Sequence, residues 1–235
     1  MPSKLLSIFT LLYLLSGHAF SQITIGAPVW DGYSNTDETG VYVEILKEVY
    51  IEDDLNFEFD SFHRLKHHFG QGKYDIILGV YDDDLTDALL PNWHLDLEYP
   101  ITAFHLKSRN LKKAAHLKDL NVSWMRGYGF ERFVSAPHKP YLVDSVNDGF
   151  KLLVNGRIDV FVDFQYNLSA EYANKVTGFE LVPARKLFIA FKNTKSGKQF
   201  AQKFDAKMKL LRDNGFLKKL YKDEYQRISF EALDH

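Results

Sequence analysis

The sequence predicts an α/β protein of two similar lobes, and two features lead to this prediction. Short apolar segments, which are typical of strands, alternate along the chain with amphipathic segments, which are typical of helices. Such alternation indicates mostly parallel sheets covered by helices on both faces. In addition, one helix–glycine–aspartate–strand pattern occurs twice, at residues 67–80 and 150–164. A chain of 235 residues is long enough for two lobes of roughly 100 residues each.

The repeated pattern is a helix that ends at a glycine, followed by a basic residue, an apolar residue, an aspartate and a buried strand. The first copy places Gly72 and Asp75 before the strand IILGV, and the second places Gly156 and Asp159 before VFVDF. Glycine ends helices because it adopts the left-handed conformation without strain. We expect the two aspartates, which open their strands, to cap turns rather than to bind a ligand.

Residues 1–21 are interpreted as a secretory signal and not as part of the fold. Lys4 precedes an apolar run over 5–15, and the segment ends in AFS at 19–21. A charged start, a short apolar centre and small residues before the cleavage site are typical of such signals. The apolar run is far shorter than the roughly 20 residues that cross a bilayer. The sequence therefore predicts export to the periplasm, without a lipid anchor because the chain has no cysteine.

The other elements are predicted from hydrophobic periodicity. Val43, Leu46 and Val49 share one face of the first predicted helix. In chain order, strands are expected over 23–26, 56–59, 76–80, 122–125 and 160–164, and helices over 40–50, 61–69, 130–134, 198–212 and 216–225. Extended stretches over 101–107 and 181–191 are expected to hold the two crossings between the lobes. The predicted lobes are residues 22–104 with 187–235, and residues 105–186.

Composition and missing motifs exclude several classes of function. Lysine plus arginine number 29 and aspartate plus glutamate 31, so no basic field favours nucleic acid or an anionic membrane. The absence of cysteine excludes disulfides, thiolate metal sites and thiol nucleophiles. Patterns for a Ser/His/Asp triad, a nucleophile elbow or a phosphate loop are absent as well. The sequence thus favours a binding protein without a cofactor over an enzyme.

Ligands of parallel sheets bind at the carboxyl ends of the strands, and this rule selects candidate site residues in the first lobe. Trp30 and Tyr33 follow the first strand. Their rings either form the wall of a site or pack beneath their own loop. Gly79 ends a later strand, where it would permit the close approach of a ligand. Tyr81 and Asp82 come just after it, as ligand contacts or as part of a solvated acidic loop.

The second lobe adds Asp163, Arg126, Gly127 and Tyr128 as candidates. Asp163 ends a buried strand, where an acid is costly unless a cation or several donors pair with it. It therefore either binds a cationic group or caps the helix that follows. Arg126 and the next two residues either form an anion site with backbone N–H groups, or Arg126 pairs with Glu131 in solvent.

Two patterns suggest a metal, and neither is specific. His63 and His67 are one helical turn apart, but they share a polar helix face with Arg64 and Lys66, and a solvated face explains them better. The acidic triplet at 82–84 lacks the following glycine and the distal glutamate of a calcium loop. Neither a metal nor a cofactor is predicted.

Several segments resemble the extracytoplasmic solute-binding proteins of family 3, the amino-acid-type receptors of ABC importers. These segments are ITIGAPVWDGY, GKYDIILGVY, LDLEYPI, SVNDGFKLLVNGRIDVFVDF and FDAKMKLLRDNGFLKKLYKDEY. The resemblance implies the two-lobe type II periplasmic-binding fold and the capture of a small polar or zwitterionic solute between the lobes by hinge motion. It also implies that Asp163 accepts the ammonium group of the solute.

One departure from this family concerns the solute's carboxylate. Members that bind α-amino acids carry an arginine shortly after the first lobe's glycine-containing strand, whereas residues 81–91 contain neither arginine nor lysine. Arg126 is the candidate substitute. An ordinary amino-acid ligand held in the ordinary way is therefore not expected.

The expected partners are a small-molecule solute and the membrane subunits of an importer, and the protein is expected to be a monomer that binds no nucleic acid. Two other functions stay open. A ligand-sensing module would dock on a membrane receptor. An exported, dehydratase-like enzyme of the same fold would use Asp163 or Asp82 as an acid or base.

Overall fold

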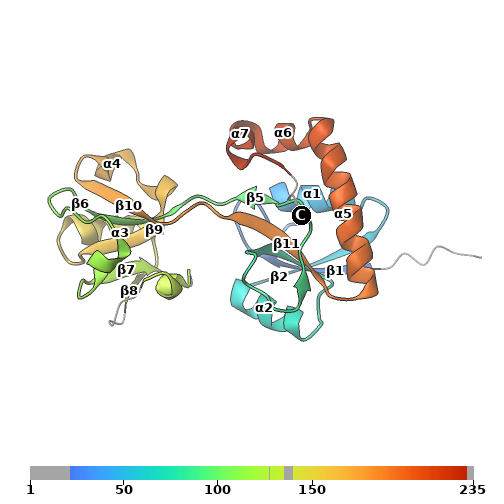
Figure 1. The fold of residues 1–235 in the computed structure, drawn as a ribbon, viewed down its shortest axis with the longest axis horizontal. Helices are drawn as coiled ribbons and strands as arrows, with labels where there is room; N and C mark the ends of the chain where they lie inside the picture. The colour runs from blue at the N-terminus through green and yellow to red at the C-terminus, as the bar shows by residue number, and fades with distance from the viewer. Residues whose placement is uncertain (1–21, 127, 135–139, 232–235) are drawn as a thin grey trace, which may run out of the picture. The chain divides into compact units, whose positions relative to one another are not determined.

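The computed structural model describes residues 22–126, 128–134 and 140–231, which form two units (Figure 1). The chain leaves the first unit after Leu95 and returns to it after Lys186. The predicted signal segment, residues 1–21, lies outside the described residues. None of the helices in the described part combines the length and apolar character needed to cross a membrane.

The first unit contains a mixed sheet with the strand order β2-β1-β3-β11-β4. Its parallel strands are β1 (Gln22–Pro28), β2 (Asp54–Asp60) and β3 (Ile76–Val80). The return strand β11 (Lys186–Lys192) runs antiparallel to β3 and pairs with the short strand β4 (Ala88–Leu89). The two-residue strand β5 (Asp96–Leu97) also pairs with β11, so the two crossing segments of the chain are paired with each other.

Helices cover both faces of this sheet, which explains why its inner strands β3 and β11 contain continuous apolar runs. The helices are α1 (Val41–Val49), α2 (Phe62–Gly70), α5 (Lys195–Asp213), α6 (Phe216–Tyr221), η5 (Lys222–Glu224) and α7 (Tyr225–Ile228). Ile76 and Leu78 of β3 pack into a core shared with α1 and α5. Ile77 packs into the core on the other face, with Leu65 and Phe69 of α2.

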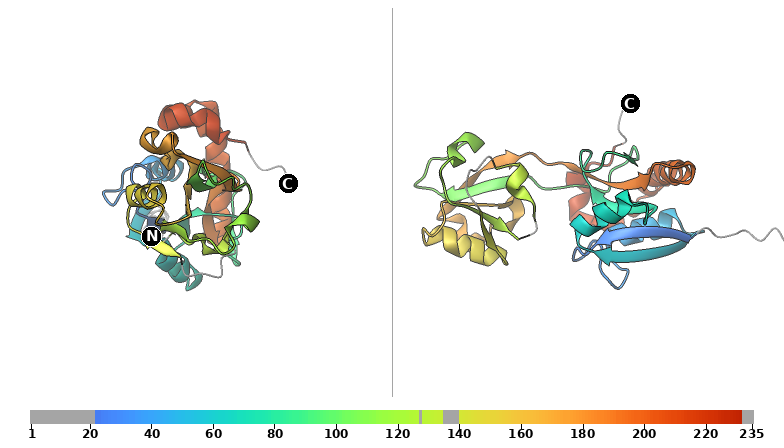
Figure 2. Two further views of the ribbon diagram at one scale, coloured as in Figure 1. Left: turned by 90° about the vertical axis from the view of Figure 1, so that its left-hand side faces the viewer. Right: turned by 90° about the horizontal axis from the view of Figure 1, so that it is seen from below.

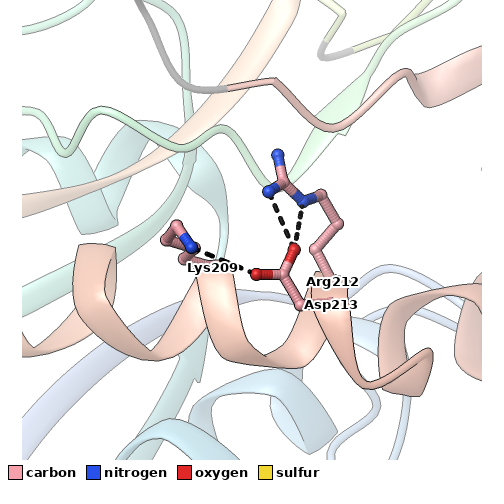
Figure 3. Close-up of polar contacts among 3 residues, drawn as sticks. All are labelled: Lys209, Arg212 and Asp213. Atoms are coloured by element: carbon pink, nitrogen blue, oxygen red, sulfur yellow. Dashed lines mark hydrogen bonds and ion pairs between the residues drawn. The ribbon is translucent and has the colours of Figure 1, made fainter.

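Helix α5 is fixed at both ends. The hydroxyl of Thr194 caps its first turn. At its end, Asp213 accepts hydrogen bonds from Lys209 at 3.2 Å and from Nη2 of Arg212 at 2.8 Å (Figure 3). These bonds, that of Arg212 first, lower the pKa of the Asp213 carboxyl. The guanidinium of Arg212 also lies 4.8 Å from the ring centre of Trp93, which connects the end of the helix to the first unit's core.

The second unit contains a sheet with the strand order β10-β6-β9-β7-β8. The strands β7 (Val122–Met125), β8 (Tyr141–Val143) and β9 (Val160–Phe164) are parallel, and β6 (Ile101–Leu106) and β10 (Val176–Val182) continue the sheet antiparallel. Its helices are η2 (Ala114–Leu117), η3 (Phe130–Arg132), α3 (Val146–Val154), η4 (Gln165–Asn167) and α4 (Ala170–Ala173). Figure 2 shows α3, in yellow, along one face of this sheet.

The predicted α/β fold of two units is present, with sheets that are mixed because the strands beside the crossings run antiparallel. The predicted boundary after residue 104 is wrong, since the first unit ends at Leu95. Strand β6 pairs with both β9 and β10, so it belongs to the second unit along its whole length. The helix predicted at 130–134 is the shorter 3-10 helix η3.

The sequence repeat is a structural repeat. The backbone N–H of Thr24, in the first unit, donates to Oδ2 of Asp75 at 3.0 Å. In the second unit the N–H of Asn121 donates to Oδ2 of Asp159 at 2.8 Å. Both glycines that end the repeated helices have a positive φ, 80° and 67°. The two aspartates therefore bind the backbone of a neighbouring segment distant in sequence, and not the local turns that the sequence predicted them to cap.

Candidate functional site

The parallel strands of each unit end at one edge of its sheet, which we call the carboxyl edge. In the first unit the predicted site residues at this edge are Trp30, Tyr33, Tyr81 and Asp82, and in the second they are Arg126, Tyr128 and Asp163. Gly127 lies outside the described residues. Each carboxyl edge is described by itself.

Gly79 forms a bulge at the carboxyl edge of the first unit. Val80 pairs with Phe188 and Leu78 pairs with Ile189, which leaves Gly79 as the extra residue of β3. Its φ of 76° is one that glycine adopts at no cost and other residues adopt with strain. The glycine is therefore required by the backbone at this position.

The ring of Trp30 lies against Gly79, where the Cβ of any other residue would be. The same ring contacts Tyr42 and Phe62, with ring centres 6.3 and 6.2 Å apart. The space beside Gly79, which the sequence assigned to an approaching ligand, is thus filled by the protein's own tryptophan. Trp30 itself is partly exposed.

Substituting Gly79 by alanine is expected to lower the free energy of unfolding by about 3 kcal/mol, because the positive φ and the displaced ring both cost energy. Gly32→Ala is the matched control, since Gly32 has a φ of 78° and nothing within 4 Å of the added Cβ. It should cost only the backbone term, about 1 kcal/mol. Urea denaturation measures both, and equal losses would contradict the packing of Trp30 on Gly79.

The remaining candidates of the first unit lie on its loops. Tyr33 is partly buried, and its ring centre is 5.0 Å from that of Tyr42. The N–H of Tyr81 donates to Oδ2 of Asp84 at 2.9 Å, which closes a turn in which Asp82 is exposed. Asp82 thus lies in an exposed acidic turn.

Asp163 is completely buried, with an exposed fraction of 0%. Its Oδ1 accepts hydrogen bonds from the N–H of Phe164 at 2.8 Å and from Nδ2 of Asn167 at 3.0 Å. Its Oδ2 has no hydrogen-bond partner among the described residues. Burial raises the pKa of this carboxyl to about 6, against the lowering effect of the two hydrogen bonds. The helix-cap alternative is not supported, because η4 begins after Phe164 without a side-chain cap.

Arg126 pairs with Asp144 and not with the predicted Glu131. Met125 of β7 pairs with Val143 of β8, so the residues that follow them are neighbours. Nε of Arg126 lies 2.7 Å from Oδ1 of Asp144, and both side chains are exposed. An exposed ion pair of this kind contributes little to stability.

Aromatic side chains gather at the carboxyl edge of the second unit. This aromatic cluster consists of Tyr99, Tyr128, Phe130, Phe164 and Tyr166. Tyr128 is 5.2 Å from Phe130 and 5.8 Å from Phe164, and Phe164 is 5.9 Å from Tyr166 in a nearly parallel stack. Tyr99 joins the cluster 4.8 Å from Tyr166. Both Tyr128 and Tyr166 are exposed.

Of this cluster, sequence reasoning selected only Tyr128 as a site residue and missed the other four, of which Phe130 was predicted only as the start of a helix. Phe164 and Tyr166 follow Asp163 at the end of the same strand, so the strand-end rule that selected Asp163 would also have found them. Tyr99 offers no such signal. It precedes β6, and its place beside Tyr166 depends on the pairing of β6 with β9.

In the part of the chain that the structure describes, no group of three or more histidine, aspartate or glutamate side chains is arranged to hold a metal ion. His67 and His68, on the helix face considered for a metal, instead contact the side chain of Gln71. This agrees with the interpretation of that face as a polar surface.

No protein-family model matches the chain, and no curated protein matches its sequence. Solved structures do match. A substrate-binding protein of an amino-acid ABC transporter is 16% identical with a TM-score of 0.61, covering 88% of this chain and 100% of that one. A histidine-bound substrate-binding protein of an ABC uptake transporter from Streptococcus pneumoniae is 15% identical (TM-score 0.61, 87% and 92% covered). A histidine kinase sensor domain similar to periplasmic binding proteins is 14% identical (TM-score 0.63, 90% and 98% covered). The chain therefore has the fold of the substrate-binding proteins of amino-acid ABC transporters.

Proposed function

We propose that the protein is an exported solute-binding protein that captures a small polar or zwitterionic solute through an ammonium group. The observation that supports this most directly is the buried carboxylate of Asp163, whose Oδ2 has no partner among the described residues. A buried, ionised carboxylate oxygen is costly to leave unpaired, and an ammonium group supplies both the charge and the hydrogen bond. In the second unit, the proposed ligand contacts are Asp163 and the neighbouring ring of Tyr128.

The solute would be delivered to a membrane importer or reported to a receptor. Substrate-binding proteins of importers and a histidine kinase sensor domain both share this fold at similar TM-scores, so the fold supports either destination. In both cases the protein returns its solute chemically unchanged. Export through the predicted signal segment is part of the same proposal.

An enzyme of the same fold is the second candidate, because the pKa of Asp163 is raised to about 6. A carboxyl with such a pKa is suited to transfer protons near neutral pH. The similar solved structures are named as binding proteins and a sensor domain, which favours binding over catalysis.

The test is a thermal-shift screen of amino acids, amines, organic acids and sugars, followed by recovery of the compound that stabilises the protein. We expect a stabilising compound that carries an ammonium group, is recovered unchanged, and has no effect on Asp163→Ala. Asp144→Ala is the control, since Asp144 is an exposed carboxylate of the same edge. Consumption of the compound would favour the enzyme, and a neutral sugar that stabilises both variants would refute the proposed site.

A further inference from the structure

We propose that the solute is an organic amine, a cation that carries N–H groups on an aromatic or alkyl body and has no α-carboxylate. This inference rests on the proposed solute-binding function and names the class of its ligand. It follows from three features of the carboxyl edges, each observed within a single unit.

The first feature is the unpaired oxygen of Asp163. Oδ1 already accepts two hydrogen bonds, whereas Oδ2 has none within the described residues and the side chain has no exposed surface. What this oxygen lacks is a hydrogen-bond donor with a positive charge. A primary or secondary ammonium group satisfies both needs. A quaternary ammonium group supplies only the charge.

The second feature is the aromatic cluster beside this carboxylate. Phe164 directly follows Asp163 at the end of β9, and its ring centre is 5.8 Å from that of Tyr128. Burial, followed by the charge of Asp163, also raises the pKa of the Tyr128 phenol. Ring faces attract organic cations, and they also stack on an apolar body. Five clustered rings next to one buried acid thus favour an ammonium group attached to a hydrocarbon over an inorganic cation.

The third feature is that the candidate cation at this edge of the second unit already faces a carboxylate. Arg126, the candidate for holding a solute's carboxylate, is paired with Asp144 at 2.7 Å. A solute carboxylate would have to displace Asp144 from Arg126. A cation without a carboxylate does not meet this obstacle.

The experiment compares amines with their parent amino acids by isothermal titration calorimetry at pH 7.5. The pairs are 2-phenylethylamine with phenylalanine, histamine with histidine, and cadaverine with lysine. In the pair with the tightest binding, the amine should bind at least tenfold more tightly than the amino acid. The N-trimethylated form of that amine should bind at least tenfold more weakly than the amine itself. If the amino acid binds as tightly as the amine in every pair, the inference is wrong while the solute-binding function stands. Failure of every compound, here and in the thermal-shift screen, would refute that function too.

Two variants test whether the amine uses the aromatic cluster and the carboxylate. Tyr166→Ala should weaken binding of the amine about tenfold, in line with the loss of one cation–ring contact. Tyr141→Ala is the matched control, because both tyrosines are 59% exposed and Tyr141 makes no ring contact within the described residues. Asp163→Asn should weaken the amine at least a hundredfold, and its circular dichroism spectrum shows whether it is folded. Equal effects of the two tyrosine substitutions would exclude the cluster from the site.

Discussion

Asp163→Asn is expected to make the solute-free protein more stable at pH 7, by about 1–3 kcal/mol. The pKa of this carboxyl is raised from 3.8 to about 6, chiefly because burial disfavours its charged form. The folded state therefore binds the proton more tightly than the unfolded state, and the wild type loses stability as the pH rises from about 4 to 6. Asparagine keeps the shape and the Oδ1 acceptor without the charge, although its amide N–H groups are left to find partners.

The pH dependence separates this effect from an ordinary change in packing. Below about pH 4 the carboxyl is neutral in both states, so the advantage of the asparagine variant should disappear there. Urea denaturation at pH 4, 5, 6 and 7 measures the difference, which should grow up to pH 6 and then stay constant. Asp144→Asn is the control, because Asp144 is exposed on the same edge and no such growth is expected. A constant loss of stability at every pH would show that Asp163 is a structural residue.

Asp163→Asn should make the protein more stable than the wild type without solute, and less stable than the wild type when the solute is present in excess. The amine that stabilises the wild type is expected to leave the asparagine variant unaffected, since its ammonium group no longer finds a carboxylate. A residue that destabilises the ligand-free protein but is needed for stabilisation by the ligand is characteristic of a binding site, where function and stability compete. Structural aspartates such as Asp159 differ, because their carboxylates are already paired within the fold.

Features set by local sequence were predictable. Gly72 and Gly156 end their helices through their own backbone conformation, and both have the positive φ that this role requires. The burial of Asp163 was predictable for the same reason, because the apolar run before it places the acid at the end of a buried strand.

Features set by distant pairing were not predictable. The unit boundary near Leu95 depends on which strands β6 joins, and the partner of Arg126 depends on β8 lying beside β7. The packing of Trp30 on Gly79 joins the loop after β1 to the neighbouring strand β3. No local pattern of a single sequence encodes these pairings. Only the structure therefore identifies which side chains are neighbours at a carboxyl edge.

Phe204→Ala is expected to lower the free energy of unfolding by about 3–5 kcal/mol, the usual loss when a buried phenylalanine is truncated. Phe204 lies on α5 with an exposed fraction of 0%, and its ring centre is 6.1 Å from that of Phe191 on the return strand β11. It belongs to the core that also contains Ile25 of β1 and Leu46 of α1. Helix α5 therefore completes a unit that also contains strand β1, and the first unit should not fold without this helix.

Leu210→Ala is the control on the same helix, because Leu210 is 56% exposed. Its truncation should lower the free energy of unfolding by less than about 0.5 kcal/mol. Tryptophan fluorescence during urea denaturation can follow each unit, since Trp30 and Trp93 lie in the first and Trp124 in the second. With Trp124 replaced by phenylalanine, the signal comes only from the first unit, and its midpoint should fall sharply for Phe204→Ala. A midpoint that moves equally for both substitutions would mean that α5 does not belong to the core of the first unit, and the discontinuous unit described above would then be wrong.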